Sequence, residues 1–297
     1  MFGAGSLGSL VGGCLARTHD VTLVGRDPHV ETVRQDGLRV SGVETFDTRP
    51  AATTEASGTT ADIAIVTVKA YDTETAARTL ATGEYGVVCS LQNGMGNEDT
   101  LAAHVDAPVV AGTATCGARL ADPGHVEWLG RGTVTLGPWH SDDTAPVERV
   151  ATAFRDGGLP ADVTTDIRRR LWEKLAVNAA INPVTALARV ENGALSGAGP
   201  LAELATAAAR ETAAVAREEG VDLSTATATD AVASVASETA ANRSSMHRDI
   251  SRGRRTEIDA INGFVVDRAA ATGESVPVNR TLTALIRGWE TGAGVRE

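Results

Sequence analysis

The chain has 297 residues, of which 42% are hydrophobic and 22% charged, so it is long enough for two packed domains and is neither disordered nor fibrous. Its formal net charge of −11 argues against nucleic acid or an anionic membrane as a partner, because both require a basic protein surface. It contains no long apolar run and no signal-peptide pattern, and we therefore expect a cytoplasmic protein.

Cysteines and lysines are few. Cys14, Cys89 and Cys116 lie far apart, without CxxC spacing or a histidine cluster, so we predict neither a disulfide framework nor a metal site. Lys69 and Lys174 are the only lysines, and nearly all positive charge comes from arginine. Such an acidic, lysine-poor surface is typical of halophilic proteins, although a GC-rich genome would also favour arginine codons.

A glycine-rich loop opens the chain, and a helical stretch over residues 9–16 and a strand over residues 21–24 follow it. The loop fits the pattern GxGxxG with Gly3, Ala4, Gly5, Ser6, Leu7 and Gly8. Glycines at this spacing allow a tight turn, close backbone approach to a pyrophosphate and close packing of the helix on the sheet. We therefore predict a dinucleotide-binding loop; the alternative is a glycine-rich turn without a ligand.

The strand over residues 21–24 ends in Gly25-Arg26 instead of the Asp or Glu that would bind the ribose hydroxyls of NAD. An arginine at this position can pair with a 2′-phosphate, so NADP(H) is the predicted cofactor. Asp27 follows directly and weakens this prediction, and an exposed arginine without a ligand is the alternative.

The first strand is unusually short. Only Met1 and Phe2 precede Gly3, whereas a strand of this kind needs about five residues. Because a buried central strand cannot be missing, we expect the true start to lie upstream, with a valine codon read as the initiator at Met1.

Up to about residue 136, short Val- and Ile-rich runs alternate with alanine-rich amphipathic stretches, which predicts an α/β, Rossmann-type, doubly wound sheet. The expected elements are strands at residues 63–68, 87–91 and 109–113, a hairpin of residues 126–128 and 133–136, and a helix at residues 146–156. Lys69 and Asn93 follow two of these strands, so we expect both at the crevice where the glycine loop lies. A solvated lysine and a simple Asn-Gly turn are the alternatives.

After about residue 165 the β character disappears, and the chain reads as an all-helical C-terminal domain. We expect helices at residues 167–182, 201–219, 227–242, 254–271 and 278–287. The predicted organisation is therefore an NADP-binding domain over residues 1–165 and a helical substrate-binding and catalytic domain over residues 166–297.

Polar residues form a stripe on the first of these helices. Lys174, Asn178 and Asn182 recur every four residues and span about 80° of the helix surface among apolar neighbours. A buried ammonium and two amides need a polar ligand or partner, although a satisfied polar seam between helices would also explain them. Pro183 is expected to end or kink the helix.

A second buried polar group is expected in the helix over residues 254–271. Glu257 shares a helix face with Ile261 and Phe264, whereas Asp259 points the other way. Glu257 therefore needs a partner, for which Lys174 is the candidate.

Together these motifs resemble the ketopantoate reductase family over essentially the whole chain. The resemblance rests on residues 2–8, 66–71, 92–96, 172–175 with Asn178, Asn182 and Pro183, 192–193, 243–246, and 256–259 with 261–263. It implies reduction of 2-dehydropantoate to (R)-pantoate by NADPH, a step toward pantothenate and coenzyme A.

The resemblance also implies residue roles. Lys174 would be the general acid, and Lys69, Gly117 and Glu257 would contact the cofactor, with Asn93 between the nicotinamide and the substrate. The residues implied to hold the substrate's hydroxyl and carboxylate are Asn178, Asn182, Asn192 and Ser245. The partner would be a small 2-oxo acid, and a homodimer is one candidate assembly.

Two other functions stay open. A related NADPH-dependent reductase of another small 2-oxo acid would share all these motifs. A non-catalytic NADP-sensing protein would share the glycine loop, but the presence of both Lys174 and Glu257 argues against it, because such a protein does not need a general acid for binding alone.

Overall fold

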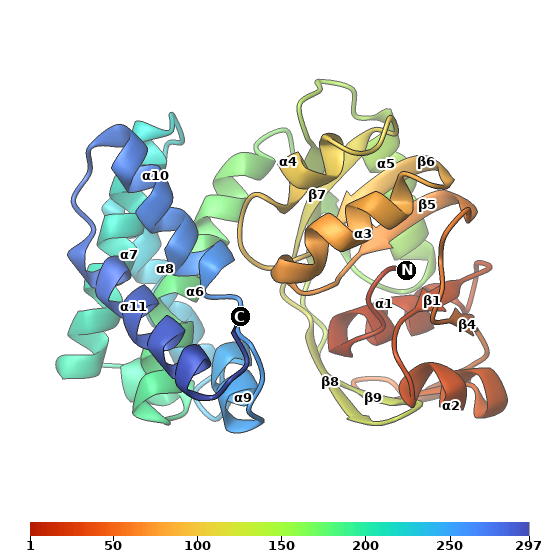
Figure 1. Cartoon of the computed structure of the whole chain (residues 1–297), viewed down its shortest axis with the longest axis horizontal. Coiled ribbons are helices and arrows are strands. Elements are labelled where there is room, and N and C mark those ends of the chain that lie inside the picture. The colour runs from red at the N-terminus through yellow and green to blue at the C-terminus, as the bar shows by residue number, and fades with distance from the viewer. Residues whose placement is uncertain (297) are drawn as a thin grey trace. The chain divides into compact units, whose positions relative to one another are not determined.

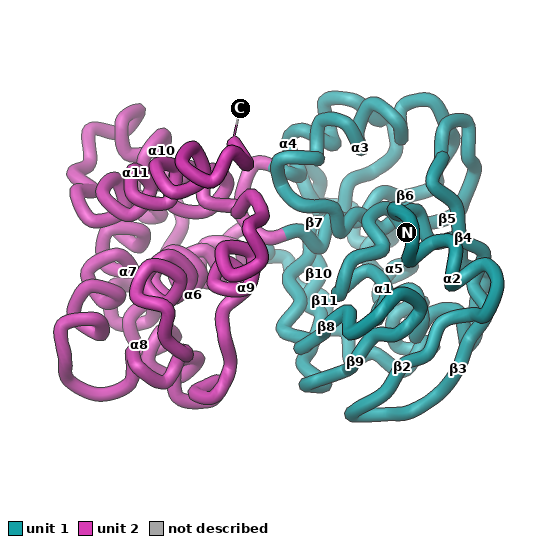
Figure 2. Tube along the Cα trace, turned by 60° about the horizontal axis from the view of Figure 1, so that its bottom comes forward, with its two compact units in different colours: residues 1–92, 97–167 teal, residues 93–96, 168–297 magenta. Residues whose placement is uncertain are grey.

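The computed structural model describes residues 1–296, which form two compact units (Figure 2). Unit 1 comprises Met1–Gln92 and Asn97–Ile167, and unit 2 comprises Asn93–Gly96 and the chain from Arg168 onward. The four residues Asn93–Gly96 therefore pack with the C-terminal half of the sequence.

Unit 1 contains the elements coloured from red to green in Figure 1. Its strands are β1 (Thr22–Val24), β2 (Leu38–Gly42), β3 (Phe46–Thr48), β4 (Ala51–Thr53), β5 (Thr60–Val66), β6 (Glu84–Ser90), β7 (Val109–Ala114), β8 (Gly117–Asp122), β9 (His125–Gly130), β10 (Val134–Pro138) and β11 (Ala161–Val163). Its helices are α1 (Ser6–Leu15), α2 (His29–Asp36), the 3₁₀ turn η1 (Ala70–Asp72), α3 (Thr73–Leu80), α4 (Asn97–Ala102) and α5 (Ala145–Asp156).

The main sheet has the strand order β11-β10-β7-β6-β5, in which β5, β6 and β7 are parallel. Strands β1 and β4 form a separate parallel pair. Phe2 makes single parallel bridges to Val24 of β1 and to Val66 of β5, so it lies between the pair and the main sheet. Parallel strands connected through helices make this an α/β fold of the Rossmann type, as the sequence predicted.

The expected hairpin of residues 126–128 and 133–136 is wrong. Strand β9 pairs antiparallel with β8 and parallel with β2 in a second sheet of order β3-β2-β9-β8, whereas β10 pairs with β7 in the main sheet. The turn signal that matters is Asp122-Pro123-Gly124, where Gly124 has a φ of +72° that favours glycine. This turn connects β8 to β9 and leaves residues 131–133 as a link between the two sheets.

The unit 1 core includes buried side chains of α1 and α5, with Leu10, Val11 and Cys14 on α1 and Phe154 on α5. All three cysteines are free thiols. Burial raises the pKa of the Cys14 thiol to about 12, so at neutral pH it behaves as a small apolar side chain.

Every regular element in the described part of unit 2 is a helix or a helical turn. Its elements are α6 (Ile167–Ala188), the 3₁₀ turn η2 (Asn192–Leu195), α7 (Pro200–Glu218), α8 (Thr225–Glu238), α9 (Ser245–Ser251), the π-helix η3 (Asp259–Gly263), α10 (Phe264–Thr272) and α11 (Pro277–Gly292). Within residues 1–296, no helix has the length and apolarity needed to cross a bilayer.

Of the two effects expected of Pro183, an end to the helix or a kink, the first is wrong, because α6 continues to Ala188. A proline lacks the N–H that would bind the carbonyl four residues earlier, which here is that of Ala179. The Asn262 side chain replaces this donor, since its Nδ2 lies 2.9 Å from the Ala179 oxygen. A side chain from η3 therefore completes the hydrogen bonding of α6.

The helix expected over residues 254–271 was also wrong in its first part. The segment from Arg254 to Ile258 forms no regular helix, and a π-helical turn precedes α10, with the Gly263 N–H bonded to the Ile258 carbonyl at 2.8 Å. The short helix α9 was missed. Ser244 caps it by accepting a hydrogen bond from the His247 N–H, which is a common N-terminal signal.

Candidate functional site

Two glycines of the loop before α1 are required by close backbone approach. Gly3 has a φ of +103°, and a Cβ on it would lie 2.6 Å from the Val68 nitrogen. A Cβ on Gly8 would lie 2.1 Å from the Gly3 oxygen, and the Thr67 hydroxyl donates to that same oxygen at 2.8 Å. No side chain fits at either position, so these two glycines hold the loop against the end of β5.

Gly5 differs from the other two. It is exposed, and a Cβ on it would meet no atom within 4 Å, so its hydrogen side chain leaves open space beside the loop. Gly5 is also the N-cap of the ten-residue helix α1 and supplies no side-chain cap. Open space at an uncapped helix N-terminus suits a pyrophosphate, which the N–H groups and the helix dipole attract.

The other loop residues support the turn. Ala4 is buried, Leu7 is half-buried, and the Ser6 hydroxyl accepts a hydrogen bond from the Leu120 N–H at 3.0 Å. Ser6 thereby connects the loop to β8, the strand that begins at Gly117, which is half-buried.

Arg26 forms an ion pair that the sequence did not predict. Its side chain is 86% exposed, and its Nη2 lies 3.1 Å from Oδ2 of Asp72, three residues beyond Lys69. The fold therefore brings the segment after β1 next to the segment after β5. Asp27, which had weakened the cofactor prediction, instead accepts a hydrogen bond from the Glu31 N–H at the start of α2.

A buried polar network fixes the chain beside Lys69, which is itself half-buried. The Gln92 Nε2, in a side chain only 3% exposed, donates to the Val68 oxygen at 3.1 Å and to the Thr73 hydroxyl at 2.7 Å. Thr73 in turn donates to Asn97 at 2.8 Å. These bonds connect the carboxyl ends of β5 and β6, the place where parallel sheets bind ligands.

In unit 2, the predicted polar stripe lies on α6. Lys174 and Asn178 are half-buried, and Asn182 is 6% exposed. Between them, Leu175 and Ala179 are buried, so the stripe is set among apolar contacts.

The elements that carry Ser245 and Asn192 meet the C-terminal half of α6, in the second case because Leu195 of η2 shares a buried apolar cluster with Val184 of α6. The Thr185 hydroxyl of α6 donates to the Ser244 hydroxyl at 2.8 Å, directly before Ser245. The Asn192 Nδ2 donates to the Thr239 hydroxyl at 2.8 Å. Its Oδ1 is buried and accepts no hydrogen bond from the described residues.

Glu257 is 6% exposed and lies in the non-helical segment before η3. The segment that contains Asn93 packs on the same π-helix, because the Met95 N–H donates to the Ala260 oxygen at 3.0 Å. Gly94, with a φ of +81°, makes this approach possible, since a Cβ there would lie 2.6 Å from Ala260. Asn93 thus joins the unit that contains Lys174 and Glu257, which its position after β6 did not predict.

Two family models match this chain. The model described as ketopantoate reductase PanE/ApbA covers residues 1–141, and the model of the C-terminal domain of that family covers residues 166–290.

Curated relatives match it over nearly their whole length. The 2-dehydropantoate 2-reductase of Archaeoglobus fulgidus is 44% identical over 98% of this chain and 97% of its own. That of Halobacterium salinarum is 45% identical over 96% of both chains.

Solved structures match it as well. A PanE/ApbA family ketopantoate reductase from Ralstonia eutropha aligns with a TM-score of 0.90 at 33% identity, covering 99% of this chain and 98% of its own. A D-mandelate dehydrogenase in a ternary structure with NADH and anilino(oxo)acetate aligns with a TM-score of 0.93 at 25% identity, over 99% of this chain and 98% of its own.

Proposed function

Because the chain belongs to the ketopantoate reductase family, we propose that it reduces 2-dehydropantoate to (R)-pantoate with NADPH, a step toward pantothenate and coenzyme A. The observation that carries the proposal is the 44–45% identity to two 2-dehydropantoate 2-reductases over nearly the whole chain. The presence of Lys174, Asn178 and Asn182 on one face of α6 supports the same reaction.

The cofactor is a nicotinamide dinucleotide, and the loop before α1 would hold its pyrophosphate. The space beside Gly5 and the uncapped start of α1 fit this group. For NADP in particular, the support is Arg26, whose guanidinium can pair with a 2′-phosphate, and Lys69 would add a second positive charge. The D-mandelate dehydrogenase with bound NADH shares this fold, so a direct comparison of the two cofactors is needed.

When bound, the reduced nicotinamide would supply the hydride that the ketone carbon of the substrate accepts. Negative charge then develops on the carbonyl oxygen. The Lys174 ammonium would polarise this oxygen and donate the proton that completes the hydroxyl group, and general acid catalysis of this kind contributes about 10²–10⁴-fold.

Neutral amides and a hydroxyl would position the substrate. Asn178 and Asn182 extend the stripe of Lys174 by one and two turns of α6. Asn192 and Ser245 lie on elements that contact the C-terminal half of α6, and together the four side chains offer donors and acceptors for a carboxylate and a hydroxyl group.

The remaining assignments concern the nicotinamide. We assign Asn93 a position between substrate and nicotinamide, Gly117 a backbone contact with it, and Glu257 a contact with its ribose that also orients Lys174. A net charge of −11 favours an enzyme that binds small molecules and not nucleic acid. We also propose a cytoplasmic location, with a homodimer as the assembly to test.

A spectrophotometric assay of NADPH oxidation tests the proposal. We expect turnover with ketopantoate to exceed turnover with 2-oxoisovalerate, pyruvate and phenylglyoxylate. A higher kcat/KM for another 2-oxo acid would overturn the substrate assignment but keep the reductase. Binding of NADPH without oxidation by any of them would favour the non-catalytic sensor.

A further inference from the structure

The segment that carries Glu257 has little regular backbone structure of its own. No regular helix covers residues 254–258, so the position of Glu257 depends on contacts made by neighbouring side chains. Two such contacts flank it, one at the preceding residue and one two residues later.

The first contact is made by Glu290 of α11, whose side chain is fully buried. Its Oε1 accepts hydrogen bonds from both the N–H and the hydroxyl of Thr256, each at 2.7 Å. A buried carboxylate that accepts two bonds from one residue fixes both the backbone and the side chain of that residue. Thr256, directly before Glu257, is thereby held to α11.

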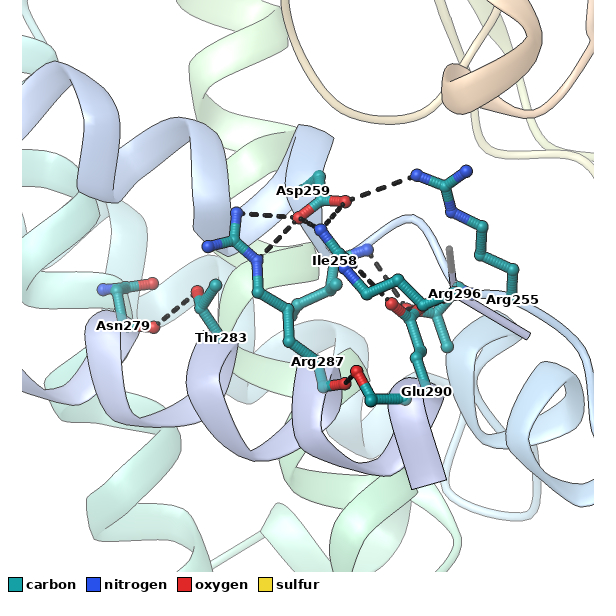
Figure 3. Close-up of polar contacts among 10 residues, drawn as sticks. Arg255, Ile258, Asp259, Asn279, Thr283, Arg287, Glu290 and Arg296 are labelled. Carbon is teal, nitrogen blue, oxygen red and sulfur yellow. Dashed lines mark hydrogen bonds and ion pairs between the residues drawn. The ribbon is translucent and has the colours of Figure 1, made fainter. Parts of the chain in front are cut away.

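The second contact is made at Asp259, the first residue of η3. Its Oδ1 accepts from the Arg287 Nε at 2.8 Å, and Arg296 lies 2.8 Å from its Oδ2 (Figure 3). Burial alone would raise the pKa of Asp259, but hydrogen bonds from Arg287 and Arg296 outweigh it, so the pKa lies below its ordinary value. Asp259 is therefore an anion at neutral pH.

Arg296 takes part in both contacts. Its Nη1 lies 2.7 Å from Oε2 of Glu290, and its Nη2 lies 3.0 Å from Oδ1 of Asp259. The guanidinium is only 22% exposed and has the planar, forked geometry that can bind two carboxylates at once. One side chain near the C-terminus thus connects the groups that hold the residues on either side of Glu257.

We propose that Arg296 is a positioning residue for Glu257, because it holds Glu290 on Thr256 and Asp259 at the start of η3. The inference rests on the proposed contact of Glu257 with the nicotinamide ribose. It assigns the chain terminus a part in cofactor binding that the sequence pattern did not indicate, since Arg296 lies 39 residues beyond Glu257.

A double-mutant cycle tests the proposal. Arg296→Met removes the guanidinium group but keeps an apolar side chain of similar length. The substitution is made both in the unaltered enzyme and in a Glu257→Gln background. NADPH affinity is measured by fluorescence titration, alongside kcat and KM with ketopantoate. We expect Arg296→Met to weaken NADPH binding roughly tenfold in the unaltered enzyme and less than about twofold in the Glu257→Gln background, because coupled residues are not additive.

Two further variants separate positioning from general stability. Arg296→Lys should bind NADPH more tightly than Arg296→Met but less tightly than the unaltered enzyme, because an ammonium keeps the charge but lacks the planar geometry that binds two carboxylates. Arg268→Met is the matched control, because Arg268 makes a bidentate ion pair with Glu219 elsewhere in unit 2. It should lower the melting temperature without changing NADPH affinity by more than about twofold. If Arg296→Met does not fold, Glu290→Gln replaces it in the same cycle.

Equal losses in both backgrounds would overturn the positioning role, as would a Glu257→Gln enzyme with unchanged NADPH affinity. Neither result would touch the reductase assignment, which fails only if the unaltered enzyme does not reduce ketopantoate.

Discussion

The glycine loop of unit 1 and the polar stripe of unit 2 are built on opposite principles. In the loop, Gly3, Gly5 and Gly8 matter because they lack side chains, and the candidate site is made of backbone and open space. In unit 2 the candidate groups are side chains, and a second set of buried side chains from distant segments holds their helices. A site of the first kind is broken by adding atoms, and one of the second kind by removing them.

Removing the side-chain amine of Lys174 should have the largest effect. Lys174→Ala should lower kcat by about 10²–10⁴-fold, because it deletes an interaction that strengthens in the transition state. Lys69→Ala is the natural control, since it removes the only other lysine, and it should raise KM for NADPH with little change in kcat. Near-normal kcat in Lys174→Ala would leave the α6 stripe as packing.

Adding a single methyl group should distinguish the glycines within the loop. Gly8→Ala places a Cβ 2.1 Å from the Gly3 oxygen, so it should cost about 1–3 kcal/mol of unfolding free energy as well as cofactor binding. Gly5→Ala meets no protein atom and should keep the melting temperature while NADPH affinity falls roughly tenfold or more. Calorimetry and fluorescence titration check the two effects, and unchanged affinity in Gly5→Ala would refute a pyrophosphate beside this residue.

Removing the amide of Asn262 tests the supporting side chains of unit 2. Asn262→Ala leaves the Ala179 oxygen and the Asn279 Oδ1 without this donor, at a cost of roughly 1–3 kcal/mol in denaturant unfolding. In a Pro183→Ala background the loss should be smaller, because an N–H at residue 183 can bind the Ala179 oxygen. Strict additivity of the two substitutions would contradict this compensation.

A smaller effect on NADPH affinity is expected from changing Asp72, the carboxylate that pairs with Arg26. Asp72→Asn removes the charge that pairs with Arg26, so a 2′-phosphate no longer competes with it, and NADPH should bind roughly two- to fivefold tighter. NADH affinity serves as the internal control and should not change. Weaker NADPH binding would mean that Asp72 orients Arg26 for the phosphate.

The smallest effect concerns a buried imidazole of unit 1. Burial lowers the pKa of His29 below 6.5, and its Nδ1 accepts a hydrogen bond from the Gly124 N–H, so the folded protein holds the ring neutral. The unfolded chain binds the proton more readily, and the free energy of unfolding should therefore fall as pH decreases below about 6.5. His29→Gln should flatten this part of the stability profile, and an unchanged slope would show that other groups cause it.

The strands that could be predicted from the sequence are those whose signal lies within the strand itself. Strands β5, β6 and β7 were predicted because buried parallel strands are continuous apolar runs. Strands β3 and β4, at three residues each and partly exposed, carry no such signal, and the pairing of β9 with β2 joins segments more than 80 residues apart. Local pattern cannot show a partner at that distance.

For the candidate site, the glycine loop and the α6 stripe could be predicted because each lies within a few consecutive turns of chain. The Arg26–Asp72 pair, the bond of Asn262 to Ala179 and the contact of Arg296 with Asp259 join residues 37 to 83 positions apart. Pro183 could have suggested a replacement donor, because a proline inside a helix leaves a carbonyl to be satisfied, but not which residue supplies it.

The π-helix η3 makes the length of this segment as important as its residues. A π turn accommodates one residue more than an α-helical turn, so deleting one residue from Asp259–Gly263 would let the helix continue as regular α. Each residue advances an α-helix by about 100°, and the deletion would rotate everything before it relative to α10. Both the Glu257 side chain and the Ala260 carbonyl that accepts from the Met95 N–H would then point in a different direction relative to α10. Insertions and deletions that a surface loop tolerates should therefore be damaging here, even when they preserve every named side chain.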